Sequence, residues 1–395
     1  MARRPASVLE GALTFLRGSV RRFLLAVLST AAAVGQSATF DEVAAQAGTA
    51  RRANRLPEAI ELYRQAVQLR ASWLEGWWFL GTLSYATYQY PGCETAFHEF
   101  VKLDDKRALA WSLLGLCEFE TGKYDAALDH LRVSLAGKDL APEVEAGVRF
   151  HYGLLLTRAG LFDPGKRELE RYARSGAHEP MLISGLGLNA LHQPLLPKDV
   201  PAERMDAVTQ AGAATRSWIL GEIDQAEAGF QQLVKQYPAL AGVHYLCGTY
   251  LSYVRPDQAM AEFRRELELN PDNSDAGAML ALLLLNAKDL SAAAPYAKRA
   301  AAKSSDALSD YAYGQVLLGT GDLRAAIPRL EAAARLEPAN LQYHAALAGA
   351  YSRAGRRADA RLERRVSLDL ATGITDSVAA QTAATQTTVH PPENR

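Results

Sequence analysis

The chain has 395 residues, 49% of them apolar, and its 43 basic side chains nearly balance 44 acidic ones. This length allows two or three domains with a buried core. A net charge of -1 creates no general attraction to nucleic acid or to an anionic membrane, so neither is an expected partner.

The N-terminus carries a basic segment followed by an apolar run over residues 23–35, FLLAVLSTAAAVG. The run is too short to span a bilayer and is typical of a secretory signal, with small residues before Gln36 for cleavage. We therefore expect residues 1–35 to direct export to the periplasm or cell envelope. An uncleaved segment that anchors the protein in the inner membrane, facing the periplasm, is the alternative.

Small residues recur along the chain in a repeating pattern, most often 33 or 34 positions apart. They are Ala47, Gly81, Gly115, Gly153, Ala214, Gly248, Ala281, Gly314 and Ala348. A second small residue follows each of them 11 or 12 positions later, and a turn residue, usually glycine, lies between the two. The pattern predicts a repeated unit of helix, tight turn and helix.

Two antiparallel helices joined by so short a turn must cross closely, and bulk at the crossing would separate them at a cost of about 1 to 3 kcal/mol. Apolar residues at helical spacing, such as Trp111, Leu114 and Leu131, predict the face that packs in the core. The second helix of several units is expected to end before a proline, as at Pro271 and Pro338.

With this spacing, Trp111, Leu114, Gly115, Ala127 and the prolines after the second helices, the chain resembles the tetratricopeptide repeat, a 34-residue helical hairpin. The resemblance covers about residues 40–172 and 207–371. It implies an all-α solenoid of about nine stacked hairpins in two sub-arrays. In the last unit Arg364 occupies a position that is apolar elsewhere, which suggests a polar capping helix.

The expected organisation is therefore an N-terminal array over residues 36–172, a connector over 173–206, a C-terminal array over 207–371 and a disordered tail over 372–395. The connector combines one extra apolar helix, MLISGLGLNAL, with a proline-marked segment. It is interpreted as a packed hinge or spacer, and the alternative is an element that shapes a pocket. The tail is polar and has no periodicity, for which disorder is expected.

Three cysteines, Cys93, Cys117 and Cys247, are odd in number and far apart in sequence. This spacing argues against a disulfide framework and against zinc ligands, so we expect small, buried and inert side chains.

No enzyme motif is visible in the sequence. Gly185 and Gly187 lack the third glycine of a dinucleotide loop, and His98-Glu99 lacks the second histidine of a zinc-protease helix. The remaining histidines are scattered through different units. The prediction is a non-catalytic protein without a cofactor or a bound metal.

In a stack of hairpins the first helices line a concave wall, and in similar proteins one stripe of this wall holds the ligand. The side chains expected on that stripe are largely aromatic and form the predicted groove: Trp78, Tyr85, Phe119, Phe150, Trp218, Tyr245 and Tyr311. Aromatic residues dominate binding hot spots, which favours an extended peptide or an amphipathic helix as ligand. The lysine and asparagine clamp of related domains that bind chaperone C-termini is absent from these positions.

The leading hypothesis is an exported interaction scaffold or assembly factor that binds another protein, or copies of itself, through the aromatic groove. A second hypothesis, from a different class, is a binding protein for a small apolar molecule such as a lipid or a glycan fragment. An enzyme with an unrecognised site is the third.

Overall fold

The computed structural model describes residues 39–137 and 139–372. The predicted signal segment and nearly all of the predicted tail lie outside these residues. Within them the chain forms 19 α-helices and one short 3₁₀ helix, without strands, which confirms the all-α fold. The described chain divides into two compact units, one ending at Gly229 and one beginning at Phe230.

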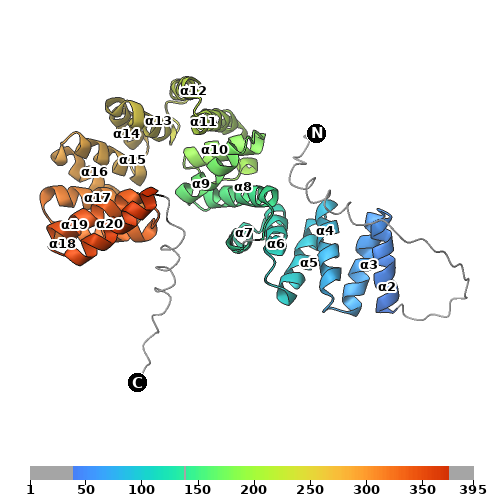
Figure 1. The fold of residues 1–395 in the computed structure, drawn as a ribbon. Helices are drawn as coiled ribbons and strands as arrows, with labels where there is room; N and C mark the ends of the chain where they lie inside the picture. The colour runs from blue at the N-terminus through green and yellow to red at the C-terminus, as the bar shows by residue number, and fades with distance from the viewer. Residues whose placement is uncertain (1–38, 138, 373–395) are drawn as a thin grey trace, which may run out of the picture. The chain divides into compact units, whose positions relative to one another are not determined.

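The helices of the first unit follow one another along the chain with short connections (Figure 1). They are α2 (Phe40–Arg52), α3 (Leu56–Leu69), α4 (Leu74–Ala86), α5 (Tyr90–Leu103), α6 (Ala108–Thr121), α7 (Tyr124–Ala136), α8 (Pro142–Arg158), α9 (Phe162–Arg174), α10 (Pro180–Ala190), η1 (Pro197–Asp199) and α11 (Ala202–Leu220). The boundary between the units lies inside α12 (Ile223–Gln236). It does not coincide with the proline-marked connector.

The second unit continues with the same alternation of helix and turn. Its helices are α13 (Val243–Val254), α14 (Pro256–Leu269), α15 (Ser274–Asn286), α16 (Leu290–Lys303), α17 (Ala307–Thr320), α18 (Leu323–Leu336), α19 (Leu341–Arg353) and α20 (Arg357–Thr372). Three second helices, α12, α14 and α18, end just before the dipeptides that contain Pro238, Pro271 and Pro338, as predicted.

Adjacent helices pair into hairpins, and each hairpin packs on the next. The first helix of a hairpin contacts its own second helix, the second helix of the preceding hairpin and neighbouring first helices, as α4 contacts α6 and α15 contacts α17. Successive second helices make no comparably extensive contact in the described ranges. The first helices therefore lie closest together in each stack, as expected for the inner side of a solenoid.

The predicted close crossing is present within the hairpins. A Cβ atom added at Gly115 would lie 2.6 Å from Leu131 Cδ2, and one added at Gly81 would lie 2.6 Å from Phe97 Cε2. Gly314 meets Leu330 in the same way, at 2.8 Å. In these pairs the small residue of the first helix accommodates a large, fully buried residue of the second helix.

In eight hairpins the turn places a left-handed residue seven positions after the first small residue, whereas in the hairpin α13–α14 Arg255 occupies this position with a φ of -146°. Glycine supplies it in five hairpins, with φ between 76° and 84° at Gly122, Gly160, Gly221, Gly321 and Gly355. Three hairpins place a non-glycine residue in the same conformation, namely Asn54, Tyr88 and Lys288, with φ between 56° and 64°. The turn is therefore retained even where its usual residue is replaced.

The predicted extra helix is α10, and it packs against α8, α9 and α11. Its crossing with α11 brings backbone against backbone: a Cβ atom at Gly187 would lie 1.9 Å from Val208 O, and one at Gly212 would lie 1.8 Å from Ile183 O. Leu182, Leu186 and Leu188 of α10 are buried in the core of the first unit. The segment is thus an integral packing element of this unit.

The last helix, α20, buries only Ala360 among its side chains. Arg364, the polar residue at an otherwise apolar repeat position, is exposed and donates to Ser352 Oγ at 2.7 Å. None of the helices in residues 39–137 and 139–372 is long and apolar enough to cross a membrane.

Candidate protein-binding surface

Trp78 and Tyr85, two of the predicted groove residues, lie about two turns apart on the same face of α4, and both keep part of their surface accessible. The Trp78 ring packs on Phe97 and Phe100 of α5, with ring centroids 5.7 and 5.3 Å apart. The Arg107 guanidinium lies 5.8 Å from the centre of the same ring. Trp78 is thus held by neighbours while part of the indole remains open to a ligand.

Tyr85 belongs to a cluster of three tyrosines at the turn between α4 and α5. The Tyr85 and Tyr90 rings are 5.8 Å apart, and the Tyr88 and Tyr90 rings are 6.2 Å apart. Burial raises the pKa of the Tyr85 hydroxyl, with further contributions from Tyr90 and Glu120. The hydroxyl is therefore neutral at physiological pH and available for hydrogen bonding.

Tyr88 was not predicted from the sequence as a site residue. Its side chain is 65% exposed, although it is a large aromatic residue, and its φ of 60° is the left-handed conformation that the turn requires. A left-handed aromatic residue on the surface is unusual and directs attention to function. The signal in the sequence is a tyrosine at the repeat position that is usually glycine.

Phe119 and Phe150 are only 9% and 7% exposed. Phe119 packs against Tyr124 and His151, and Phe150 stacks on Tyr172 with ring centroids 4.8 Å apart. These two predicted groove residues therefore present little surface to a ligand. Their burial reflects the dense core around α8, to which α10 and its leucines contribute.

Trp218, near the end of α11, is partly exposed, and the Lys166 ammonium lies 5.6 Å from its ring centre. The lysine comes from α9, so Trp218 is distant in sequence from Trp78 and Tyr85 and contacts different hairpins. The first unit does not bring all five of its predicted aromatic residues into one cluster.

In the second unit Tyr245 and Tyr311 are both partly exposed. The Tyr245 ring lies 6.1 Å from that of Phe263, and the Tyr311 ring lies 4.7 Å from that of Tyr343 on the next first helix. Burial raises the pKa of Tyr311. Each of these tyrosines is positioned by a core aromatic residue, as Trp78 is in the first unit.

A shallow cavity of about 310 Å³ lies between the start of α8, the end of α9 and the turn before α10. Its lining includes Glu143, Tyr172, His178 and Glu179. Tyr172 donates a hydrogen bond to Glu179 Oε1 at 3.2 Å, and burial together with the Glu179 charge raises the pKa of Tyr172 to about 12. Five of its lining residues, from Ser175 to Glu179, belong to the predicted connector segment 173–206, so the start of this segment helps to form the cavity.

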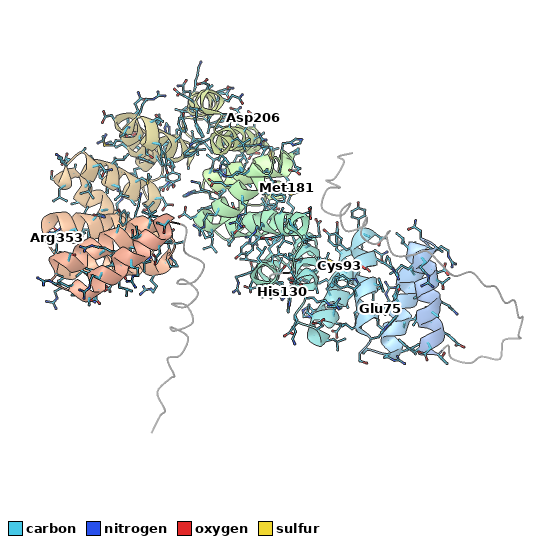
Figure 2. All side chains as sticks on the ribbon, viewed as in Figure 1. Glu75, Cys93, His130, Met181, Asp206 and Arg353 are labelled. Atoms are coloured by element: carbon cyan, nitrogen blue, oxygen red, sulfur yellow. A yellow bond between two sulfur atoms is a disulfide. The ribbon has the colours of Figure 1, made fainter. Side chains whose placement is uncertain are left out.

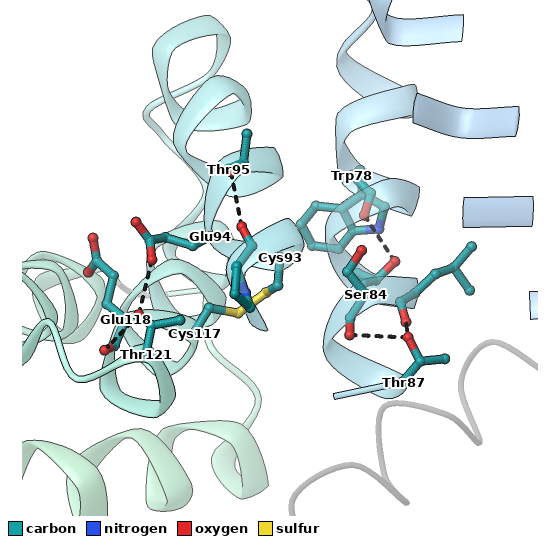
Figure 3. Close-up of a disulfide and its surroundings, with 12 residues drawn as sticks. Trp78, Ser84, Thr87, Cys93, Glu94, Thr95, Cys117, Glu118 and Thr121 are labelled. Atoms are coloured by element: carbon teal, nitrogen blue, oxygen red, sulfur yellow. Dashed lines mark hydrogen bonds between the residues drawn. A yellow bond between two sulfur atoms is a disulfide. The ribbon is translucent and has the colours of Figure 1, made fainter. Parts of the chain in front are cut away.

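The prediction for two of the cysteines was wrong. Cys93 and Cys117 are buried as expected, but they form a disulfide between α5 and α6, with Cα atoms 6.1 Å apart (Figure 3). Their sequence separation of 24 corresponds to the step from a second helix to the following first helix, which pack against each other. The Thr121 hydroxyl donates to Glu94 at 3.0 Å across the same junction.

Cys247 is the free thiol of the described chain and is buried, as predicted. Burial, with a smaller contribution from Glu262, raises the pKa of its thiol, so it remains protonated and unreactive. No group of three or more His, Cys, Asp or Glu side chains in the described ranges is arranged to hold a metal ion. Side chains such as His130 and Asp206 lie on separate hairpins (Figure 2).

A family model described as Tetratricopeptide repeat matches residues 89–143 and 255–307. Both segments begin at or beside a second helix and extend through the following hairpin, one in each compact unit. The hairpin crossings, the left-handed turns and this match define a tetratricopeptide-repeat protein. The chain carries tetratricopeptide repeats and has the α-solenoid fold that the sequence predicted.

Several solved structures resemble the chain at low identity. MamA residues 41 to end from Desulfovibrio magneticus RS-1 is 22% identical, with 43% of this chain and 97% of that chain covered at a TM-score of 0.36. The Cut9–Hcn1 hetero-tetramer of the APC/C is 13% identical, with 84% and 87% covered at a TM-score of 0.40. YrrB, described as a TPR protein with an unusual peptide-binding site, is 21% identical, with 46% and 92% covered at a TM-score of 0.34. No match was found among curated protein sequences.

Proposed function

We propose that this protein is an exported, non-catalytic scaffold or assembly factor of the cell envelope, which binds a peptide or helical segment of another protein. Repeat proteins of this fold present extended surfaces for protein binding and generally carry no catalytic site. Each unit has its own proposed contact surface, made of partly exposed aromatic residues of its first helices and, in the first unit, of the adjoining turn. They are Trp78, Tyr85 and Tyr88 in the first unit and Tyr245 and Tyr311 in the second.

The observation that carries the proposal is the combination of exposure and rigid support at these aromatic residues. Trp78 is braced by two phenylalanines, and Tyr311 is braced by Tyr343, while both retain accessible surface. An aromatic ring that is already fixed loses little freedom on binding and contributes a large contact area. Such residues are the usual energetic centres of protein interfaces.

Export is supported by two independent features. The apolar run over residues 23–35 is typical of a secretory signal. The Cys93–Cys117 disulfide is a feature of proteins that fold in oxidising compartments, since cytosolic thiols are kept reduced. Fusion of residues 1–40 to a reporter that is active only outside the cytosol tests this part, and a reporter that stays inactive would contradict it.

Binding is tested by capturing partners from envelope extracts with the wild-type protein and with a Trp78→Ala, Tyr88→Ala double variant. The control is Val133→Ala, which removes an exposed apolar residue from the second helix α7. We expect the double variant to lose partners that the wild type and the control retain. Identical captures from all three would reject this surface. Mass spectrometry of an organic extract of the purified protein would reveal a lipid or glycan, and its presence would favour a small-molecule role instead.

A further inference from the structure

One repeat position connects successive hairpins through a side chain. This position lies four residues before the small residue of a first helix and is occupied by Trp77 and Trp111 in two hairpins of the first unit. Each indole N–H donates a hydrogen bond to the main-chain carbonyl of the residue six positions earlier in the sequence. The donor–acceptor distances are 2.7 Å to Ala71 O and 2.8 Å to Asp105 O. Each bond ties the first turn of a helix to the connection from the preceding hairpin.

In the second unit, histidine occupies the same position in two hairpins. His344 Nε2 lies 3.0 Å from Pro338 O, and His244 Nε2 lies 2.9 Å from Pro238 O, again six positions earlier. The other ring nitrogen faces a carboxylate of the second helix in the same hairpin. His344 Nδ1 lies 2.6 Å from Glu363 Oε2.

The partners of His344 determine its proton content. A main-chain carbonyl and a carboxylate both accept hydrogen bonds, so both ring nitrogens must carry protons for the two bonds to form. Neutral imidazole has one N–H and would place a lone pair against one of the two oxygens. The side chain is only 11% exposed, so water cannot readily replace the lost bond.

We infer that His344 makes the packing of the last hairpin pH-dependent. With protons on both ring nitrogens, it links α19 through hydrogen bonds to the connection after α18 and to α20. When it loses a proton, one of these hydrogen bonds is lost and the hairpin α19–α20 is less stable. His244, with Glu262 at 2.5 Å from Nδ1, repeats the geometry at α13 and α14. The tryptophans of the first unit make the same junction bond with a donor that does not titrate.

Glu363 from α20 is the charged side chain that contacts His344. No titratable side chain of the packed helices α17 and α18 forms a hydrogen bond or ion pair with it in the described structure. Burial alone would lower the pKa of His344. The bonds to Glu363 and Pro338 O, together with the Glu363 charge, outweigh burial and place the pKa above its ordinary value.

The sign of the pH effect follows from this direction. A histidine whose pKa is higher in the folded than in the unfolded chain stabilises the fold fully below the unfolded value of about 6.5, and this contribution is lost as the pH rises through the folded value. The hairpin α19–α20 is therefore tightest in mildly acidic solution and opens more readily at alkaline pH.

Hydrogen exchange of the full-length protein, followed by mass spectrometry and corrected for the intrinsic rate, tests the inference at about pH 5.5 and about pH 8.5. Protection of α19–α20 should fall at the higher pH, by about tenfold for each unit by which the pKa is raised. His344→Gln and Glu363→Gln should each abolish the difference. His178→Gln, which alters an exposed histidine of the first unit, should leave it intact.

Equal protection at the two pH values, or a pH difference that persists in His344→Gln, would overturn the inference. Selective ¹⁵N-histidine spectra of the wild-type protein give a second measurement that does not depend on a variant folding. They should show the imidazole of His344 with protons on both nitrogens near neutral pH. A neutral tautomer at that position would also overturn it.

Discussion

The contact between α10 and α11 makes a strong prediction for Gly187→Ala. The new methyl carbon would lie 1.9 Å from Val208 O, whereas ordinary contact begins at 3.4 Å, so the helices would have to separate by about 1.5 Å. The obstacle is main chain, which cannot rotate away as a side chain can. We expect a loss of about 3 kcal/mol, the upper end of the usual overpacking range.

Thermal unfolding monitored by circular dichroism measures this loss. For a unit of this size about 3 kcal/mol corresponds to a fall in Tm of roughly 6 to 12 °C. Gly48→Ala is the matched control, because the nearest atoms to its Cβ belong to the flexible end of Arg52. The control should be neutral or slightly stabilising, since alanine favours helix. An unchanged Tm for Gly187→Ala would refute the close crossing of α10 and α11.

Three further predictions concern the hairpins and the cysteines. The double variant Cys93→Ala, Cys117→Ala removes a cross-link between residues 24 positions apart in the sequence. Urea unfolding should show that it lowers the free energy of unfolding by about 3 kcal/mol, and reduction of the wild-type protein should have the same effect. Equal stability with and without the disulfide would contradict this prediction. Thiol titration should find no reactive thiol in the native protein and one, Cys247, after unfolding without reductant; an additional thiol would mean that the disulfide is absent. Gly115→Leu should destabilise neighbouring hairpins together, because its side chain would enter the space of Leu131; a change confined to α6 and α7 in hydrogen exchange would argue against shared interfaces.

The fold was predictable because the repeat imposes the same physical demand many times. The close helix crossings require a small residue, as at Gly81, Gly115 and Gly314, and the tight turns favour a left-handed residue seven positions later. The regular spacing of these residues along the sequence was enough to locate the hairpins. No single unit would have sufficed, because substitutions such as Tyr88 for the turn glycine weaken the pattern locally. The agreement of many units compensates for these departures.

Features that depend on contact between units were harder to predict. Cys93 and Cys117 are far apart in sequence, and it is the repeat, with its stacked hairpins, that brings them onto adjacent helices. The glycines of α10 carried no periodic signal, although Gly187 is essential to its crossing with α11. The burial of Phe150 depends on packing by α10 and α9, which a rule based on one helix could not include.

The most direct test of the proposed binding surface is site-specific photo-crosslinking in living cells. A photoreactive phenylalanine analogue would replace Tyr88, which is 65% exposed beside Tyr90, and in a separate strain Val133 on the second helix α7. The proposal predicts a discrete crosslinked partner from position 88 that is absent from position 133. Crosslinks of the same identity and yield from both positions, or from position 133 alone, would contradict it.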